Sequence, residues 1–342
     1  MDRMKIKVLV VEDSRTVRHM LVHLINQTAD MMVVGEAGDG SEALDLTTKL
    51  GPDVILMDVV MPHMDGLEAT RQIMQTRPTP IVLISATLGS SETEIAFKAI
   101  KAGALTVLPK PSASGGAQET ASLLSTVRAM AGVRVIHHWD NTQPYRTLPL
   151  APSGTSKPRI VAIAASTGGP AALSEIIWHL PISFTLPIVI VQHITADFVP
   201  SLVGWLNHVS KNPVKIACHG ETAMPGVIYV APGDDHLFLT KRQTFVVGPS
   251  PKVMQFMPSA DIMLESVAQS YGAQAIGIVL TGMGDDGAHG LQAMRRTGAI
   301  TIAQDEASSV VFGMPGEAIR LGAAHHVLPL SKIAPTLASL CS

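Results

Sequence analysis

The segment Ile160-Val161-Ala162-Ile163-Ala164-Ala165-Ser166-Thr167-Gly168-Gly169-Pro170 joins an apolar run directly to a turn of small residues. Its first six residues are all apolar, which is typical of a strand buried on both faces of a parallel sheet. The two glycines permit a tight turn, and Pro170 fits the first turn of a helix that follows. A strand that passes through a tight turn into a helix indicates an α/β fold.

The same alternation of apolar runs and amphipathic segments continues through this part of the 342-residue chain. Further strands are predicted at 187–192, 227–230, 275–280, 299–303 and 326–329, and helices at 171–180, 261–271 and 287–297. A β-rich excursion is predicted around Lys215–Val247. We therefore expect residues 158–342 to form a Rossmann-like, doubly wound domain with a mainly parallel sheet.

A shorter series of the same kind occupies residues 1–128. Strands are predicted at 6–11, 32–35, 54–57, 81–84 and 106–108, and helices at 14–27, 41–50, 66–76 and 92–102. Strands and helices in this order and of these lengths predict a smaller, flavodoxin-like doubly wound domain. The chain is thus predicted to be an α/β protein with two parallel-sheet domains.

Residues 129–157, between the two predicted domains, are interpreted as a linker. The hydrophobic periodicity fails from about Arg134, and His137–Lys157 contains three prolines, a glycine and scattered polar residues. An ordered strap between the domains would have the same composition, so the sequence leaves both possibilities open.

Composition and charge argue against several classes of protein, although a local basic patch could still bind nucleic acid. The net charge of −3 provides no basic field for nucleic acid, and no segment has the ~20 apolar residues that a membrane span needs. The cysteines Cys218 and Cys341 fit no metal or redox spacing, so free thiols are expected. The N-terminus has no signal-peptide pattern. We expect a cytoplasmic monomer that neither binds nucleic acid nor inserts into a membrane.

Charged and hydroxyl side chains gather at the carboxyl ends of the predicted strands in the first domain, where doubly wound sheets bind ligands. Glu12 and Asp13 follow the first strand, Asp58 the third, Thr87 the fourth and Lys110 the fifth. Clustered carboxylates favour a hard cation such as Mg²⁺, beside which a carboxylate can attack a phosphoryl group. Lys110 would neutralise the transferred charge, and Thr87 would donate a hydrogen bond. Solvated strand ends are the alternative.

Residues 5–125 resemble the receiver domain of two-component response regulators. The matching motifs are Val10-Val11-Glu12-Asp13-Ser14, Asp58-Val59-Val60-Met61-Pro62-His63-Met64-Asp65-Gly66, Ser85-Ala86-Thr87 and Leu108-Pro109-Lys110-Pro111. The resemblance implies that Asp58 accepts a phosphoryl group from a histidine kinase, that Glu12, Asp13 and Asp58 bind Mg²⁺, and that Thr87 and Lys110 form the switch. Many receivers carry an aromatic residue at the position of Val107, so readout through such a side chain is not expected here.

A second group of reactive residues is expected at the strand ends of the larger domain. Ser166 lies between a strand and a helix N-terminus, where free N–H groups stabilise negative charge. His193 ends the next strand, and Asp285 and Asp286 follow the strand at 275–280. A serine, a histidine and an aspartate at one sheet edge satisfy the requirements of a nucleophile, a base and an orienting acid.

Other interpretations of these residues are possible. Ser166 could cap the helix, or its turn could hold a phosphate. Gly282, Gly284 and Gly287 form a G-x-G-x-x-G pattern with Asp305 at the end of the following strand, which is most of a dinucleotide fingerprint. The two aspartates inside this loop argue against that interpretation, because they would repel a pyrophosphate.

Residues 158–342 resemble the catalytic domain of chemotaxis protein-glutamate methylesterases. The matching segments are Ala164-Ala165-Ser166-Thr167-Gly168-Gly169-Pro170, Val191-Gln192-His193, Val230-Ala231-Pro232-Gly233-Asp234-Asp235-His236, Pro258-Ser259-Ala260-Asp261 and Leu280-Thr281-Gly282-Met283-Gly284-Asp285-Asp286-Gly287. The resemblance implies that Ser166 is the nucleophile, His193 the base and Asp286, not Asp285, the acid. It also implies an oxyanion hole formed by backbone N–H groups near Thr167 and Met283.

Together the two resemblances imply a serine hydrolase that is activated by phosphorylation. It would demethylate glutamate γ-methyl esters on chemoreceptors and deamidate receptor glutamines, using Mg²⁺ only in the receiver and no cofactor for the esterase reaction. The unphosphorylated receiver would cover the catalytic face. The alternative function is a receiver-controlled binding module with an inert or nucleotide-binding effector domain. Met254-Gln255-Phe256-Met257 departs from the polar or basic residues common in the family, and His236 fits either the site or the core.

Overall fold

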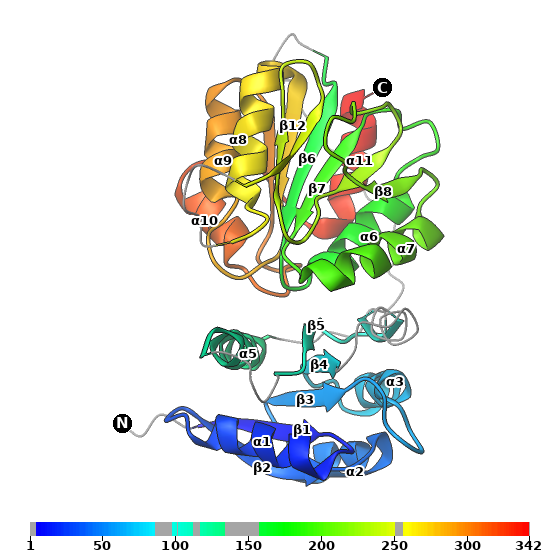
Figure 1. Ribbon diagram of the computed structural model, residues 1–342, viewed down its shortest axis with the longest axis vertical. Coiled ribbons are helices and arrows are strands. Elements are labelled where there is room, and N and C mark those ends of the chain that lie inside the picture. The colour runs from blue at the N-terminus through cyan, green and yellow to red at the C-terminus, as the bar shows by residue number, and fades with distance from the viewer. Residues whose placement is uncertain are drawn as a thin grey trace. The chain divides into compact units, whose positions relative to one another are not determined.

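The computed structural model describes residues 5–85, 98–100, 102–111, 117–133, 157–249 and 256–341. The chain divides into two compact units, Met1–Gln143 and Pro144–Ser342. Each unit contains a parallel sheet with helices packed against it (Figure 1). Within the described part of the chain, no helix is both long enough and apolar enough to cross a membrane.

The first unit is a five-stranded parallel sheet in the order β2-β1-β3-β4-β5. This strand order confirms the predicted flavodoxin-like fold. The strands are β1 (Ile6–Val11), β2 (Met31–Ala37), β3 (Val54–Asp58), β4 (Ile81–Ser85) and β5 (Thr106–Pro109), and the helices are α1 (Arg15–Asn26), α2 (Gly40–Leu50), α3 (Gly66–Thr76) and α5 (Ala117–Met130). Most of the helix predicted at 92–102 lies outside the described residues, as does Thr87.

Gly66 allows α3 to begin close to the end of β3. A Cβ atom at Gly66 would lie 2.4 Å from the backbone oxygen of Asp58, and the side chain of Asp65 caps the helix by accepting the Glu68 N–H at 2.8 Å. Because the clash would be with backbone, the strand end would have to shift. This turn therefore helps to fix the position of Asp58.

The Gly66→Ala variant is expected to lower the free energy of unfolding of the first unit by about 1–3 kcal/mol, the usual cost of overpacking. Denaturant titration of the full chain, followed by a probe placed in this unit, measures the change. Gly132→Ala is the matched control, because its Cβ would lie an ordinary 3.8 Å from the Ala129 oxygen, its nearest neighbour among the described residues. Equal stability of the two variants would contradict the steric argument.

The second unit is a seven-stranded parallel sheet in the order β14-β13-β12-β6-β7-β9-β8, which confirms the predicted Rossmann-like architecture. Its strands are β6 (Ile160–Ala165), β7 (Ile188–Gln192), β8 (Val214–Ile216), β9 (Ile228–Val230), β12 (Ala275–Val279), β13 (Ile300–Gln304) and β14 (His326–Leu328). Strands β10 (His236–Leu239) and β11 (Phe245–Gly248) form a separate antiparallel hairpin. The excursion predicted around Lys215–Val247 is therefore only partly separate, since β8 and β9 join the main sheet.

Helices cover both faces of this second sheet (Figure 1). They are α6 (Gly169–His179), α7 (Val199–Val209), α8 (Ala260–Tyr271), α9 (Ala288–Arg296), α10 (Met314–Arg320) and α11 (Leu330–Cys341), with short 3₁₀ turns at Ala196–Phe198 and Gly272–Gln274. Alternate β6 residues pack with apolar residues of α8 and α9 in one buried cluster. The apolar run at 160–165 is completely buried, as expected for a central strand.

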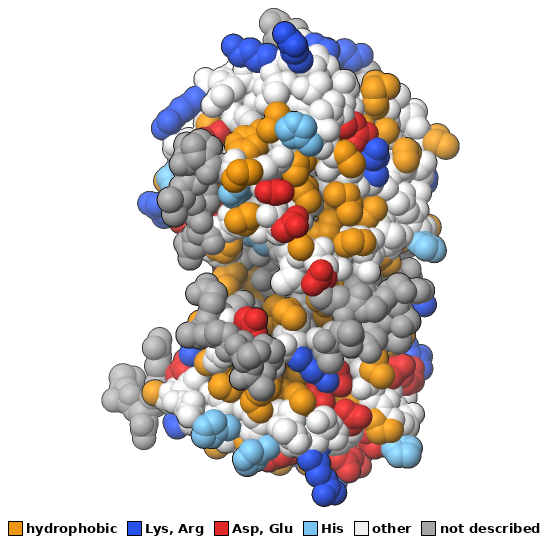
Figure 2. Space-filling view, viewed as in Figure 1, with side chains coloured by type: hydrophobic (Ala, Val, Ile, Leu, Met, Phe, Trp, Pro, Cys, Tyr) orange, Lys and Arg blue, Asp and Glu red, His pale blue; other side chains and the backbone are white. Residues whose placement is uncertain are grey.

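One face of the second unit exposes apolar and acidic side chains rather than a basic field. In Figure 2, hydrophobic and acidic side chains occupy the middle of the visible face, while lysine and arginine lie mainly near its margin. Basic residues arranged in a stripe are the usual footprint of nucleic-acid binding. The visible face does not have that pattern.

Candidate catalytic and phosphoacceptor sites

The predicted acid pocket of the first unit is assembled from three strand ends. Lys110 Nζ lies 2.7 Å from Asp58 Oδ2 and 2.9 Å from Glu12 Oε2. One carboxylate oxygen from each of Glu12, Asp13 and Asp58 lies within 4.8 Å of the others. Glu12 and Asp58 are buried and Asp13 is exposed. The structure thus brings together every predicted pocket residue that it describes.

Burial governs the electrostatics of this pocket. It raises the pKa of both Glu12 and Asp58 above their usual values, although Lys110 opposes the shift. Burial also acts to lower the pKa of Lys110, but its bonds to the two acids outweigh that effect and raise it. One cation facing three carboxyl groups leaves excess negative charge on oxygen atoms, which is the donor set that Mg²⁺ prefers. The residues therefore fit a Mg²⁺ ion.

Val107, at the position where many receivers have an aromatic side chain, is buried in β5. Only 5% of it is exposed, and it pairs with Leu83 of β4 in the sheet. A β-branched residue locked in a strand has few rotamers to exchange. The expectation that phosphorylation is not read through an aromatic side chain at this position stays a prediction.

The turn that carries Ser166 is held against two neighbouring strands. Ser166 N–H donates to Thr281 O at 3.0 Å, and Gly169 N–H donates to Ser166 O at 2.8 Å. Gly282 is needed for this approach, because a Cβ there would lie 2.7 Å from Ser166 Cβ. Gly168 is the N-cap of α6, and no side chain caps that helix. The structure therefore does not assign Ser166 the capping role.

His193 lies beside Ser166 because their strands are neighbours in register. Ala165 pairs with Gln192, and His193 N–H donates to Ala165 O at 2.9 Å. His193 Nε2 lies 2.8 Å from Asp286 Oδ2. The other ring nitrogen, Nδ1, is buried and has no hydrogen-bond partner among the described residues, and none of their hydrogen bonds joins Ser166 Oγ to His193.

The structure distinguishes the two neighbouring aspartates of the loop after β12. Asp286 is 5% exposed and contacts His193, whereas Asp285 is exposed. Adjacent residues point in different directions from a tight loop, so only one of the two carboxylates reaches the histidine. This geometry supports the choice of Asp286 that the resemblance implied.

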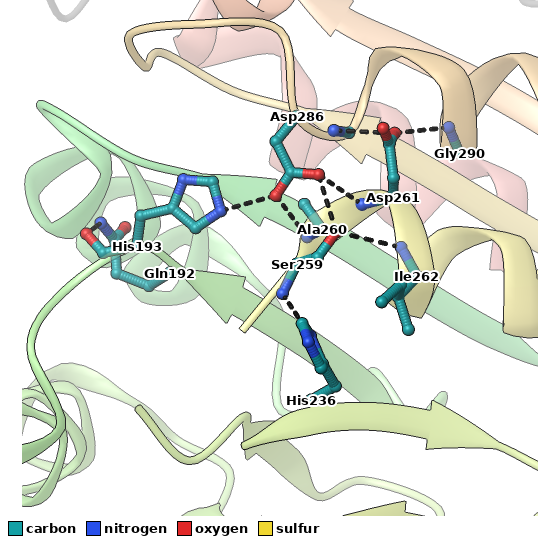
Figure 3. A network of polar contacts seen from close by, with 10 residues as sticks. Gln192, His193, His236, Ser259, Ala260, Asp261, Ile262, Asp286 and Gly290 are labelled. Atoms are coloured by element: carbon teal, nitrogen blue, oxygen red, sulfur yellow. Dashed lines mark hydrogen bonds and ion pairs between the residues drawn. The ribbon is translucent and has the colours of Figure 1, made fainter. Parts of the chain in front are cut away.

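Asp286 is held by the N-terminus of α8, a role that the sequence did not reveal. Ser259 Oγ and Asp261 N–H donate to its Oδ1, each at 2.9 Å, and Ala260 N–H donates to Oδ2 at 2.7 Å (Figure 3). Burial acts to raise the pKa of Asp286, but the bonds from His193 and from these donors outweigh it and lower the pKa. The serine that precedes α8 was a recognisable cap signal, but its acceptor is 27 residues away.

Asp261, in the first turn of α8, accepts hydrogen bonds from backbone N–H groups that follow Asp286 in the sequence. Its Oδ1 accepts the N–H groups of Gly287 and Gly290 at 2.9 and 2.6 Å, at the start of α9. Each helix N-terminus therefore binds a carboxylate supplied by the other segment. Burial raises the pKa of Asp261, and the N–H groups of Gly290 and Gly287 only partly oppose that shift. The reciprocal arrangement fixes the loop that presents Asp286.

Thr167 and Met283, whose backbone N–H groups are predicted to form the oxyanion hole, follow Ser166 and Gly282 in the sequence, and a Cβ at Gly282 would lie 2.7 Å from Ser166 Cβ. Within the described part of the chain, the N–H groups of Thr167 and Met283 donate to no protein acceptor. Thr281 Oγ1 donates to Thr167 O at 2.9 Å and so holds the peptide that follows Thr167. Two half-buried residues with unpaired N–H groups beside the serine suit the binding of an oxyanion.

Phe256 stacks on His193, with ring centroids 4.9 Å apart and planes 9° from parallel. Met257 is 57% exposed next to it, while Met254 and Gln255 lie outside the described residues. Within the segment 254–257, which departs from the family pattern, Phe256 thus packs an apolar ring directly against His193, the predicted base.

The dinucleotide interpretation gains no support from the glycine-rich loop. Asp305 Oδ1 accepts Ser308 N–H at 3.0 Å and Ser308 Oγ–H at 2.6 Å, within its own turn. Asp286, inside the loop, forms hydrogen bonds with His193 and with the N-terminus of α8. The glycines serve a loop that presents an acid rather than one that cradles a pyrophosphate.

Comparison with known proteins gives the same family over both units. The family described as CheB methylesterase matches residues 161–337, and the response regulator receiver domain matches residues 8–120. Relatives called protein-glutamate methylesterase/protein-glutamine glutaminase include one from Syntrophus aciditrophicus, 44% identical over 344 residues with 98% of each chain covered. Another, from Geobacter metallireducens, is 44% identical over 342 residues, covering 98% of this chain and 99% of its own.

Among solved structures, the catalytic domain of Thermotoga maritima CheB methylesterase matches with a TM-score of 0.52 and 41% identity. The match covers 54% of this chain and 98% of that domain. Sequence and structure therefore agree over the second unit, and the relatives extend the agreement through the first. The chain belongs to the CheB methylesterase family and combines a response regulator receiver domain with a methylesterase domain.

Proposed function

We propose that this enzyme hydrolyses glutamate γ-methyl esters on chemoreceptors, with Ser166 as nucleophile, His193 as base and Asp286 as orienting acid. The contact of 2.8 Å between His193 and Asp286, at the strand end next to Ser166, carries the proposal. The names of the relatives supply the substrate class. The boundaries that we propose are a receiver at 1–128, a linker at 129–157 and a catalytic domain at 158–342.

In the proposed mechanism, His193 removes the proton from Ser166 Oγ, which attacks the ester carbonyl carbon. The N–H groups of Thr167 and Met283 stabilise the resulting oxyanion. His193 then protonates the leaving oxygen, methanol departs, and water hydrolyses the acyl-enzyme by the same route. Asp286 stabilises the imidazolium that forms during each step. A glutamine amide passes through the same oxyanion, so deamidation with release of ammonia uses the same residues.

A fluorophosphonate probe tests whether Ser166 is activated. We expect the full chain, treated with acetyl phosphate, to acquire one phosphonyl adduct that mass spectrometry maps to Ser166. Ser339→Ala, at an exposed serine of α11, is the matched control and should label normally. A chain that stays unlabelled would favour the alternative of an inert effector domain.

We propose that Asp58 of the receiver accepts a phosphoryl group from a histidine kinase. Glu12, Asp13 and Asp58 would hold Mg²⁺, which when bound neutralises charge on the phosphoryl oxygens. Lys110, already 2.7 Å from Asp58, would pair with the phosphoryl group. Thr87 is proposed as the hydroxyl partner. The buried carboxylate cluster supports this assignment, and phosphorylation would then relieve inhibition of the esterase.

The Asp58→Asn variant is expected to lose the stimulation of methanol release by acetyl phosphate while keeping basal activity. It should also unfold at a higher denaturant concentration, because burial raises the pKa of Asp58 and charge at this position therefore opposes folding at neutral pH. Below the usual carboxyl pKa of about 4, Asp58 is protonated in both the folded and the unfolded chain, so its charge no longer lowers the free energy of unfolding. Unfolding at pH 7 and pH 4 measures the difference.

Asp45→Asn removes an exposed acid of α2 and is the matched control for charge. It should change neither the stimulation nor the unfolding midpoint. Stimulation that survives in Asp58→Asn would show that the phosphoryl group is accepted elsewhere.

A further inference from the structure

A chain of hydrogen bonds extends from His193 to a buried histidine outside the proposed triad. His236, at the start of β10, is 4% exposed, and its Nδ1 accepts the Ser259 N–H at 3.1 Å. Ser259 Oγ donates to Asp286 Oδ1 at 2.9 Å, and Asp286 Oδ2 lies 2.8 Å from His193 Nε2. Figure 3 shows the two histidines at different strands: His236 contacts Ser259, and His193 contacts Asp286.

We propose that His236 is a positioning residue for the ester hydrolysis. Its neutral ring holds Ser259, and Ser259 in turn holds the carboxylate of Asp286 in the orientation that His193 requires. The proposal rests on the function proposed above for Ser166, His193 and Asp286. It assigns His236 no contact with the substrate.

The direction of the bond from Ser259 determines the protonation state of His236. A backbone N–H can only donate, so Nδ1 must carry a lone pair, and an imidazolium would place two N–H groups against each other. Burial lowers the pKa of His236, while the charges of Asp286 and Asp235 oppose this effect. The neutral form that the hydrogen bond requires is therefore the form that burial favours.

His236 is not needed merely to attach the β10–β11 hairpin to α8. Two other hydrogen bonds do this further along the helix: Leu239 N–H donates to Ser266 Oγ at 3.0 Å, and Ser270 Oγ donates to Leu239 O at 2.9 Å. Neither bond involves the N-terminal turn of α8, where Asp286 is held. The contact at His236 is the one of these three that acts on Ser259.

Three variants of the full chain separate positioning from packing. His236→Leu removes the acceptor and keeps an apolar side chain, and we expect kcat for methanol release to fall about 10- to 100-fold with little change in KM, the cost of a small misplacement. His236→Asn places an amide oxygen where Nδ1 was and should keep kcat close to the wild-type value. Ser270→Ala removes a distant hairpin bond and should leave kcat unchanged.

A second measurement does not depend on turnover. In ¹⁵N-histidine NMR spectra recorded at one fixed pH, His236→Leu should move the Nε2 resonance of His193, because a misoriented Asp286 changes the hydrogen bond at that nitrogen, while His236→Asn should leave the resonance in place. The proposal would be overturned if His236→Leu kept the wild-type kcat. It would also be overturned if His236→Asn or Ser270→Ala lost as much kcat as His236→Leu. If the wild-type chain released no methanol, the function proposed above would fail, while the NMR result would still decide the role of His236.

Discussion

Replacing Ser166 with alanine is expected to lower the rate of methanol release from methylated receptors by about 10⁴-fold or more. The turn presents this serine at the centre of the sheet edge, between the strand that leads to His193 and the strand whose loop carries Asp286. Alanine keeps the turn and its backbone hydrogen bonds but removes the atom that would form the acyl-enzyme. A small residual rate would come from the oxyanion hole acting on water.

Methanol production by the full chain, with acetyl phosphate present, measures this effect. Ser339→Ala is again a suitable control, because it deletes an exposed hydroxyl from α11. Full activity in Ser166→Ala would disprove the nucleophile assignment and revive the alternative of a non-catalytic effector. Because no hydrogen bond joins Ser166 Oγ to His193 in the described structure, the kinetic result is the decisive one.

The sequence predicted both sheets because the strands are apolar runs bounded by clear turn signals. For the run at 160–165, the predicted bounds equal those of β6, since all six residues are buried between two neighbouring strands. In doubly wound sheets, functional side chains follow strand ends, so locating the strands also located Asp58, Ser166 and His193. The local pattern was enough for these residues.

Long-range contacts were beyond the reach of the sequence. Asp285 and Asp286 have the same chemistry and adjacent positions, so only the resemblance favoured Asp286 before burial and contacts were known. The bond from Ser259 to Asp286 depends on how α8 packs beside α9, which the sequence does not show. The contact of His236 could not be predicted from the sequence either, because its hydrogen-bond partner, Ser259, is 23 residues away.

Replacing Asp286 with asparagine is expected to lower kcat by about 10⁴-fold, a loss comparable with that expected for Ser166→Ala. The carboxylate accepts from Ser259 Oγ, from two backbone N–H groups and from the His193 ring. An amide has one oxygen, so its NH₂ group must face donors on one side. If it faces His193, the ring nitrogen there becomes an acceptor and the tautomer with a free basic Nδ1 is lost.

At neutral pH, Asp286→Asn should have a lower free energy of unfolding than the wild type. At acid pH this difference should be smaller. Because the pKa of Asp286 is lowered in the folded chain, its charge stabilises the fold above the usual aspartate pKa of about 3.9. This contribution is lost as the pH falls through the lowered value, so the gap in unfolding free energy should narrow below about pH 4. Asp285→Asn, one residue away and exposed, should show neither the kinetic loss nor the gap. An active Asp286→Asn enzyme, or an equally impaired Asp285→Asn enzyme, would mean that the buried carboxylate only anchors α8 and does not orient the base.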